Sequence, residues 1–176
     1  LLGGHQAVGT EGVAHDRGEA KITVVGVPDR VGEAARIFDV IARHDINVDM
    51  IVQNVSNVAS NRTDVSFTLA MADGKKAVES LRSEQELIGF EDLLYDDSIG
   101  KVSVVGVGMR SHPGVTARFF TALAGQGINI QMISTSEIRI SVVVEADRVD
   151  DAVRAAHTAF ELDADGEAIV YGGTGR

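Results

Sequence analysis

The segment Lys21-Ile-Thr-Val-Val-Gly26 returns later in the chain as Lys101-Val-Ser-Val-Val-Gly106. The likeness continues beyond it at glycine, alanine, asparagine, methionine and aromatic positions. The first copy has Gly32, Ala35, Arg36, Phe38, Ala42, Ile46, Asn47, Met50 and Ile51, which recur as Gly114, Ala117, Arg118, Phe120, Ala124, Ile128, Asn129, Met132 and Ile133. A period of about eighty residues is too long for the unit of a solenoid, so the sequence predicts two copies of one small domain.

Length and composition restrict the classes of protein that fit. The 176 residues have room for two modules of about 70 to 80 residues and for little else. Lysine and arginine number 16 against 26 aspartates and glutamates, and the formal charge of −10 repels nucleic-acid phosphates and anionic lipid headgroups. We therefore expect neither nucleic acid nor a membrane as a partner. Cysteine is absent, which excludes disulfides and thiolate metal sites. Without a membrane-length apolar run or a secretory signal, we expect a cytoplasmic protein.

Hydrophobic periodicity predicts the same elements in both copies, each in the order βαββα followed by a closing strand. The first copy is predicted to contain strands at 21–26, 48–54 and 65–70, helices at 34–41 and 77–81, and the closing strand Glu91–Tyr95. The second is predicted to contain strands at 101–106, 130–134 and 140–144, and helices at 116–123 and 149–160. Its closing strand has two candidates, Gly12–His15 and Glu167–Tyr171. The prediction is an α+β fold of two ferredoxin-like βαββαβ domains in tandem, with antiparallel sheets and both helices on one face.

The loop between the first strand and the first helix is a candidate ligand site in both copies. Gly32 and Gly114 let the backbone turn and leave the amide groups of a helix N-terminus free, which suits a carboxylate. The following edge presents polar side chains that could accept an ammonium group, namely Asn47, Asp49 and Gln53 with Ile51 between them, and Asn129 with residues 134–137. The same patterns also fit plain turn geometry and a solvated sheet edge.

No catalytic constellation is visible in the sequence. The histidines at positions 5, 15, 44, 112 and 157 lack the spacing of a metal site, and only His112 lies in a candidate ligand loop. Ser111 and Ser134 have no histidine and acid arranged near them as a nucleophile would need. A GxxxxGK[ST] phosphate loop is also absent. We therefore expect no catalytic residues, no metal and no cofactor in this chain.

Several motifs together resemble the tandem ACT-domain regulatory region of aspartate kinase. They are Gly12–Asp16, Asp29–Ala35, Val48–Ser56, Leu94–Asp97, Ser111–Thr116, Ile133–Ser141 and Val170–Arg176. The resemblance is closest to enzymes with a separate regulatory β subunit, which duplicates the C-terminal part of the catalytic α subunit. It implies a chain that is no enzyme by itself and that exerts feedback control on the phosphorylation of aspartate by ATP. ATP and Mg²⁺ would belong to a kinase domain outside this sequence.

The resemblance also implies domain limits, effectors and partners. It suggests a flexible segment at 1–8, a strand within 9–18 that completes the second ACT domain, the first domain at 19–98, the second at 99–172 and a tail at 173–176. The implied effectors are threonine, lysine or both, bound where the first domain of one chain meets the second domain of another. The resemblance also implies that the chain forms a homodimer and an α2β2 assembly with the catalytic subunit. The alternatives are a free-standing amino-acid sensor with another partner and, more remotely, a small acylphosphatase-like enzyme that would use Arg30.

Two sets of effector-binding residues are carried over from the family. The threonine-type site would comprise Asp29, Gly32, Glu33, Ala34, Gln53, Asn129 and Ile130. The lysine-type site would comprise Asp49, His112, Val115, Thr116, Ser136 and Glu137. The carboxylate of Asp49 or Glu137 suits the side-chain ammonium of lysine, whereas threonine needs only short polar contacts. Val31 stands where the family commonly has proline, so we expect a less rigid first loop.

Overall fold

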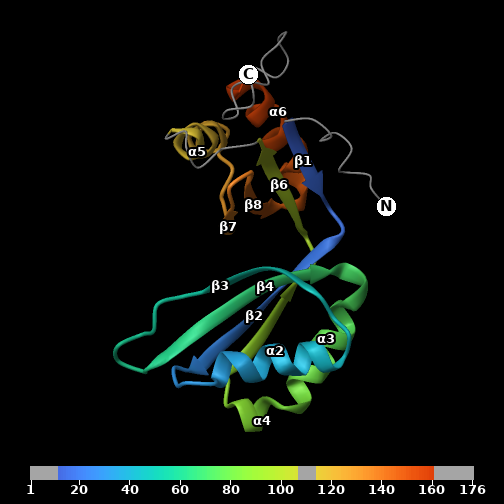
Figure 1. Ribbon diagram of the computed structural model, residues 1–176, viewed down its shortest axis with the longest axis vertical. Coiled ribbons are helices and arrows are strands. Elements are labelled where there is room, and N and C mark those ends of the chain that lie inside the picture. The colour runs from blue at the N-terminus through green and yellow to red at the C-terminus, as the bar shows by residue number, and fades with distance from the viewer. Residues whose placement is uncertain (1–11, 107–113, 161–176) are drawn as a thin grey trace. The chain divides into compact units, whose positions relative to one another are not determined.

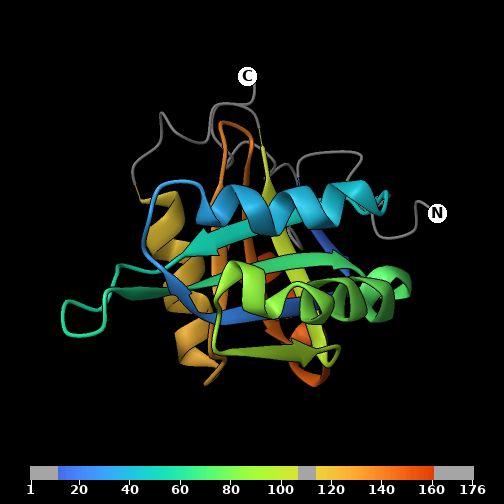
Figure 2. The ribbon, with the colours of Figure 1, turned by 90° about the horizontal axis from the view of Figure 1, so that it is seen from below.

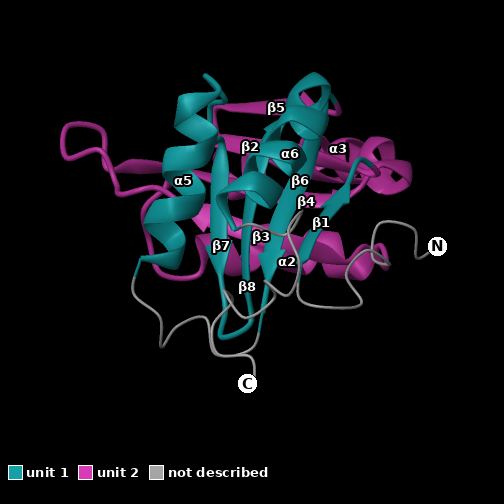
Figure 3. Ribbon diagram, turned by 90° about the horizontal axis from the view of Figure 1, so that it is seen from above, with its two compact units in different colours: residues 1–17, 98–176 teal, residues 18–97 magenta. Residues whose placement is uncertain are grey.

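The computed structural model describes residues 12–106 and 114–160, which form two compact units (Figure 3). Unit 2 comprises residues 18–97, and unit 1 comprises the segments on either side of it. His112, the candidate strand Glu167–Tyr171, the segment 1–8 and the tail 173–176 lie outside the described residues. The two units are described separately below.

Unit 2 is a four-stranded antiparallel sheet in the order β3-β4-β2-β5. Its strands are β2 (Glu19–Pro28), β3 (Val48–Gln53), β4 (Arg62–Ala70) and β5 (Asp92–Asp96). Its helices are α2 (Glu33–Arg43), α3 (Gly74–Ser83) and the short α4 (Gln85–Ile88), with a 3-10 turn at Met71–Asp73. Helices α2 and α3 cover one face of the sheet (Figures 1 and 2). The periodicity did not predict helix α4 or the 3-10 turn of unit 2.

Apolar side chains of the sheet and helices form the core of unit 2. Ile22, Ile37, Phe67 and Leu81 are fully buried, and Phe38 meets Phe67 edge-on with ring centroids 5.4 Å apart. These are the apolar positions at helical and alternating spacing, so hydrophobic burial gives the sheet its helix-covered face.

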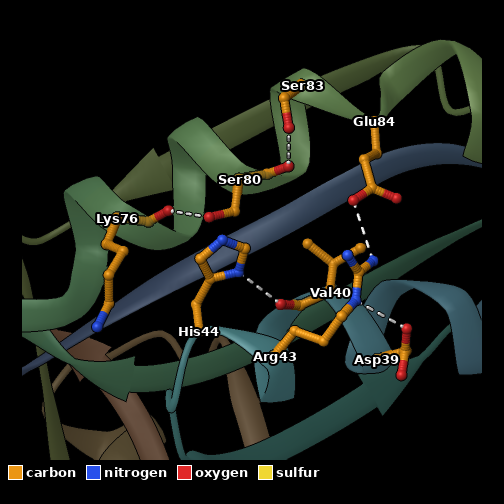
Figure 4. A network of polar contacts seen from close by, with 8 residues as sticks. All are labelled: Asp39, Val40, Arg43, His44, Lys76, Ser80, Ser83 and Glu84. Carbon is orange, nitrogen blue, oxygen red and sulfur yellow. Dashed lines mark hydrogen bonds and ion pairs between the residues drawn. The ribbon is translucent and has the colours of Figure 1, made fainter.

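Polar contacts fasten the ends of α2 and α3 to each other (Figure 4). The Arg43 guanidinium contacts the carboxylates of Asp39 and Glu84, each at 3.0 Å. These carboxylates raise the pKa of Arg43, with the hydrogen bond to Glu84 as the main cause. The His44 imidazole lies 2.9 Å from the Val40 carbonyl and ends the helix. The charged groups Asp39, Arg43 and Glu84 are at least partly exposed, so their ion pairs orient the helix ends more than they stabilise the unit.

Unit 1 repeats this architecture in the order β1-β6-β8-β7, again antiparallel. Its strands are β1 (Gly12–Asp16), β6 (Ile99–Val105), β7 (Met132–Thr135) and β8 (Arg139–Glu145). Its helices are α5 (Val115–Gly125) and α6 (Val149–Ala159), with a 3-10 turn at Ala146–Arg148, and both helices lie on one face (Figure 3). The two antiparallel sheets with their helices confirm the predicted α+β fold of tandem ferredoxin-like domains.

One edge strand of unit 1, β1, precedes unit 2 in the sequence, whereas the rest of unit 1 follows unit 2. β1 pairs with β6 from Gly12 opposite Val105 to Asp16 opposite Lys101. Val13 is buried in the core that also contains Phe119 and Phe160. Of the two candidates for this strand, the Gly12–His15 segment therefore pairs beside β6.

Equivalent hydroxyl pairs show the repeat in three dimensions. Thr23 and Ser66 face each other across β2 and β4 with their hydroxyl oxygens 2.9 Å apart. Ser103 and Ser141 do the same across β6 and β8 at 2.7 Å. Cross-strand hydroxyl pairs of this kind fix the register of neighbouring strands.

Candidate functional site

Helices α2 and α5 begin in the same way, with a glycine and no side-chain cap. Gly32 and Gly114 are the N-cap residues with φ of 94° and 100°, a left-handed conformation that favours glycine. The first helical hydrogen bonds follow, from Arg36 N–H to the Gly32 carbonyl and from Arg118 N–H to the Gly114 carbonyl. Among the described residues, the N–H groups of Ala34 and Ala35 have no acceptor, so α2 offers donors at its positive end.

Glu33 distinguishes the first turn of α2 from that of α5. Its side chain is only 9% exposed, and its Oε2 lies 2.9 Å from a guanidinium nitrogen of Arg30. Its Oε1 is 3.8 Å from Nε of Arg36 and has no hydrogen-bond partner among the described residues. A carboxylate here is favourable because it faces the positive end of the helix dipole. Val115, the equivalent residue of α5, is buried and apolar, so the two helix starts differ in charge.

Gln53 at the end of the edge strand β3 lies at the same end of the sheet as the α2 loop, whereas Asp49, next to Val48 opposite Leu69, lies toward the other end. Asp49, Ile51 and Gln53 are exposed. Gln53 pairs with Val65 and Pro28 pairs with Arg62, so the end of β3 and the start of the loop flank the first residues of β4. The Asp29 N–H donates to the Asn61 carbonyl at 3.0 Å, which ties the loop to this end of the sheet. Unit 2 therefore places five residues of the threonine-type set at one end of its sheet, namely Asp29, Gly32, Glu33, Ala34 and Gln53.

Unit 1 has the corresponding arrangement around the edge strand β7. Thr135 pairs with Ile140 and Val105 pairs with Arg139, so Ser136 and Glu137 in the β7–β8 turn lie at the end of the sheet from which the chain leaves β6. Ser136 and Glu137 are exposed, and the Ser136 N–H bonds the Arg139 carbonyl at 2.8 Å. Exposed Asn129 and half-buried Ile130 precede β7 at the opposite end of the strand, whereas exposed Thr116 lies in the first turn of α5.

The comparisons with known proteins agree with this geometry. The family model for the ACT domain matches residues 22–85 and 102–160. The chain belongs to the ACT-domain family. It is 43% identical to the regulatory subunit of aspartate kinase from Thermus thermophilus, with a TM-score of 0.80 over 86% of this chain and 98% of that one. A crystal structure of aspartokinase alpha and beta subunits matches at 46% identity and a TM-score of 0.81, covering 86% of this chain and 99% of that chain.

Curated relatives are longer than this ACT chain. The aspartokinase of Mycolicibacterium smegmatis is 58% identical over 94% of this chain, which spans 39% of that relative's length. The resemblance to the regulatory region of aspartate kinase is confirmed by these matches. In the described part of the chain, no helix is long and apolar enough to cross a membrane, and no cluster of three metal-ligating side chains occurs.

Arg62 is a structural residue of the first ACT site that the sequence analysis missed. Its guanidinium donates to the carbonyls of Gly26 at 2.6 Å and Gly89 at 2.8 Å, and its Nε pairs with Glu91 at 3.3 Å. Gly26 lies in the bulge that interrupts the β2–β4 pairing and has a positive φ of 70°. Arg62 thus holds the bend from which the chain enters the loop before α2. The repeat of Gly26 as Gly106 could have marked the bend, but no sequence pattern links it to Arg62.

Proposed function

We propose that this chain is the amino-acid-sensing regulatory part of an aspartokinase. In this proposal, threonine, lysine or both bind at the starts of α2 and α5 and control the phosphorylation of aspartate by ATP on a catalytic partner. The observation that carries the proposal is the pair of equivalent helix N-termini, each with a positive-φ glycine and no side-chain cap. The other described helices also lack a side-chain cap, but only α2 and α5 among them begin at a positive-φ glycine, where a carboxylate ligand would use the free N–H groups.

The polar residues around each helix start suit a free amino acid. The α-carboxylate of the effector would accept hydrogen bonds from first-turn N–H groups such as those of Ala34 and Ala35. In the threonine-type site, the Gln53 amide offers a short polar contact on the neighbouring edge strand. In the lysine-type site, Glu137 and Asp49 offer carboxylates to the side-chain ammonium, a charge-assisted contact that threonine does not make. We therefore assign threonine to the α2 loop and lysine to the α5 loop.

Each set of site residues draws on both ACT units. Asn129 and Ile130 belong to unit 1 but complete the threonine-type set of unit 2, and Asp49 of unit 2 completes the lysine-type set of unit 1. We propose that a second copy of the chain supplies these residues, so that the sites form in a homodimer. A homodimer with one interface repeated by symmetry would contain each kind of site twice.

The catalytic partner is an aspartokinase α subunit or kinase domain. This part of the proposal is supported by the similarity to a beta subunit that crystallised together with an alpha subunit. ATP and Mg²⁺ would bind to that partner. An effector changes the activity only if it binds the inhibited arrangement of the assembly more tightly than the active one. We propose that bound amino acid tightens the dimer of ACT units and thereby favours the inhibited kinase.

Calorimetric titration with L-threonine and L-lysine tests the proposal, with D-threonine as the matched control ligand. Light scattering during the titration reports the number of chains. We expect L-threonine to bind and to stabilise a dimer, Gln53→Ala to weaken threonine selectively, and Glu137→Gln to weaken lysine selectively. Absence of heat from both amino acids, with the catalytic chain present as well as absent, would overturn the proposal. Effector binding without copurification of a catalytic chain would favour the alternative of a free-standing sensor.

A further inference from the structure

The backbone bend at Gly26 is held by two side chains of the neighbouring strand β4. The Gly26 N–H donates to Oδ1 of Asp64 at 2.9 Å, and the Gly26 carbonyl accepts from Nη1 of Arg62 at 2.6 Å. Gly26 lies in the bulge that interrupts the pairing of β2 with β4, so these side chains take the place of strand partners. We call the contacts of Arg62 and Asp64 with Gly26 the side-chain clamp.

Further contacts fix the guanidinium of the clamp in one orientation. Nη1 of Arg62 also donates to the carbonyl of Gly89 at 2.8 Å, and Nε pairs with a carboxylate oxygen of Glu91 at 3.3 Å. The Glu91 side chain in turn lies over Gly26, where an added Cβ would come within 2.5 Å of its Oε1. The bend is therefore enclosed by β4 on one side and by the segment before β5 on the other.

The clamp lies at the base of the loop that leads to α2. Directly before Arg62, the Asn61 carbonyl accepts the Asp29 N–H of this loop at 3.0 Å. Farther along the loop, Val31 is fully exposed, so its side chain does not anchor the loop to the unit. The position of the loop relative to the sheet is therefore set at its base.

Unit 1 carries the opposite charges at the two positions of the clamp. The strands β4 and β8 are aligned by their cross-strand hydroxyl pairs. In this alignment, Glu137 is equivalent to Arg62, and Arg139 is equivalent to Asp64. A glutamate carboxylate has no hydrogen to donate, and a guanidinium does not accept. In the described part of the chain, the side-chain clamp is thus confined to unit 2.

The equivalent bend of unit 1 is held by the backbone instead. The Gly106 N–H donates to the Ile138 carbonyl at 2.8 Å. Ile138 is equivalent to Thr63, which lies between the two clamp residues. A backbone carbonyl is present whatever the side chain, so the bend of unit 1 keeps its acceptor when side chains change. The bend of unit 2 depends on the identity of two side chains.

We propose that Arg62 and Asp64 are positioning residues for the threonine site at the start of α2. They act through the loop and not by contact with the effector, because they fix the bend from which the loop reaches the first-turn N–H groups. A loop released from the clamp must be ordered when threonine binds, and the lost conformational entropy lowers the affinity. The inference rests on the proposed function and names two residues that control the α2 site without controlling the α5 site.

Calorimetric titration of Arg62→Met with L-threonine and with L-lysine tests the proposal. This substitution removes the N–H donors and keeps an unbranched side chain. Arg62 borders an open hollow of about 310 Å³, so its replacement leaves no gap in the apolar core and the variant should fold. We expect the Kd for threonine to rise about tenfold or more, as for the loss of hydrogen bonds from a charged donor, and the Kd for lysine to stay unchanged.

Three further variants separate positioning from a general loss of charge. Arg43→Met is the matched control, because Arg43 also contacts two carboxylates in unit 2 but lies at the other end of α2, and it should leave both affinities unchanged. Asp64→Asn keeps an oxygen that accepts the Gly26 N–H and should retain threonine binding. Asp64→Ala removes that acceptor and should weaken threonine selectively.

Hydrogen exchange gives a second readout that does not depend on affinity. In Arg62→Met, the amides of Gly26 and Asp29 should exchange faster than in the wild type. Amides in the middle of β2 and β4 should keep their protection, and saturating threonine should slow the exchange of Asp29 again. Faster exchange throughout unit 2 would show a general structural role and would overturn the inference.

The outcomes separate this inference from the proposed function. If the wild type binds threonine and Arg62→Met binds it equally well, the inference is overturned and the proposed function stands. Equal weakening of threonine and lysine in Arg62→Met also overturns the inference. If Arg62→Met does not fold, Asp64→Ala decides, and full threonine affinity in that variant overturns the inference. If the wild type binds neither amino acid, with the catalytic chain present as well as absent, the proposed function is wrong and the inference falls with it.

Discussion

Unit 2 and unit 1 have the same sheet order and the same glycine-capped first helix, yet they differ wherever the chain leaves the shared core. Unit 2 is continuous in sequence and has a long β3–β4 connection, whereas unit 1 is closed by the distant strand β1 and has a short β7–β8 turn. The helix starts differ as well, with the buried carboxylate of Glu33 in one and the apolar Val115 in the other. The shared parts are the apolar cores and the glycine residues that begin the first helices, and the differences lie in a connection, an edge strand and the first helical turn.

The largest effect is expected from truncating a central aromatic residue in each unit. Phe67→Ala should destabilise unit 2 by about 3–5 kcal/mol, since it removes a fully buried ring and its contact with Phe38. Phe119→Ala should do the same to unit 1. Hydrogen exchange should show faster opening in the substituted unit only. If either substitution accelerated hydrogen exchange equally in both units, the units would unfold together, which would contradict this prediction.

A smaller loss of stability is expected from a substitution in β1, the strand of unit 1 that precedes unit 2 in the sequence. Val13→Ala should destabilise unit 1 by roughly 1–3 kcal/mol because Val13 is 3% exposed and packs in that core. Leu93→Ala on β5, the corresponding edge strand of unit 2, is the matched control and should affect unit 2. Denaturant titration followed by exchange mass spectrometry distinguishes these outcomes. Loss of protection in residues 18–97 after Val13→Ala would contradict the assignment of β1 to unit 1.

The N-cap glycines Gly32 and Gly114 extend the comparison to the loops before α2 and α5. Gly32→Ala and Gly114→Ala should each cost about 1–2 kcal/mol, because an added Cβ meets no atom within 4 Å but strains a backbone with positive φ. Gly125→Ala at the end of α5, also open to solvent and without positive φ, should be neutral or slightly stabilising. Calorimetry should show Gly32→Ala weakening threonine and Gly114→Ala weakening lysine. The same loss of both effectors in both variants would show that the two loops do not bind separate ligands.

The smallest effect concerns an exposed ion pair between Arg17, directly after the edge strand β1, and Asp150 of α6. The hydrogen bond from Arg17, 2.6 Å from Asp150, lowers the pKa of the Asp150 carboxyl, and the charge of Arg17 adds to the effect. Its contribution to stability is therefore present above the ordinary carboxyl pKa and disappears as the pH falls through the lowered value. NMR titration of Arg17→Gln should show the Asp150 pKa rising. Arg43→Gln in unit 2 is the control and should leave that titration unchanged.

Local periodicity was sufficient to predict the shared parts of the two units. The apolar spacing of residues 34–41 and 116–123 indicated helices that the structure extends to Glu33–Arg43 and Val115–Gly125. Pairing between distant segments leaves no local pattern, which is why β1 had a competing candidate. The contacts of Arg62 with Gly26 and Gly89 were unpredictable for the same reason, because folding alone brings these carbonyls together. The burial of Glu33 likewise depends on Arg30 and Arg36 turning toward one carboxylate.

The position of β1 has a consequence for how the protein is made on the ribosome. β1 emerges before unit 2, but its partner β6 begins only after all of unit 2 has been synthesised. At about 5–20 residues per second, roughly eighty residues take several seconds to a quarter of a minute, long enough for unit 2 to fold during translation. Throughout that interval β1 is an unpaired strand with an apolar face. The nascent chain therefore presents a folded unit 2 next to a strand whose partner strand has not yet been synthesised.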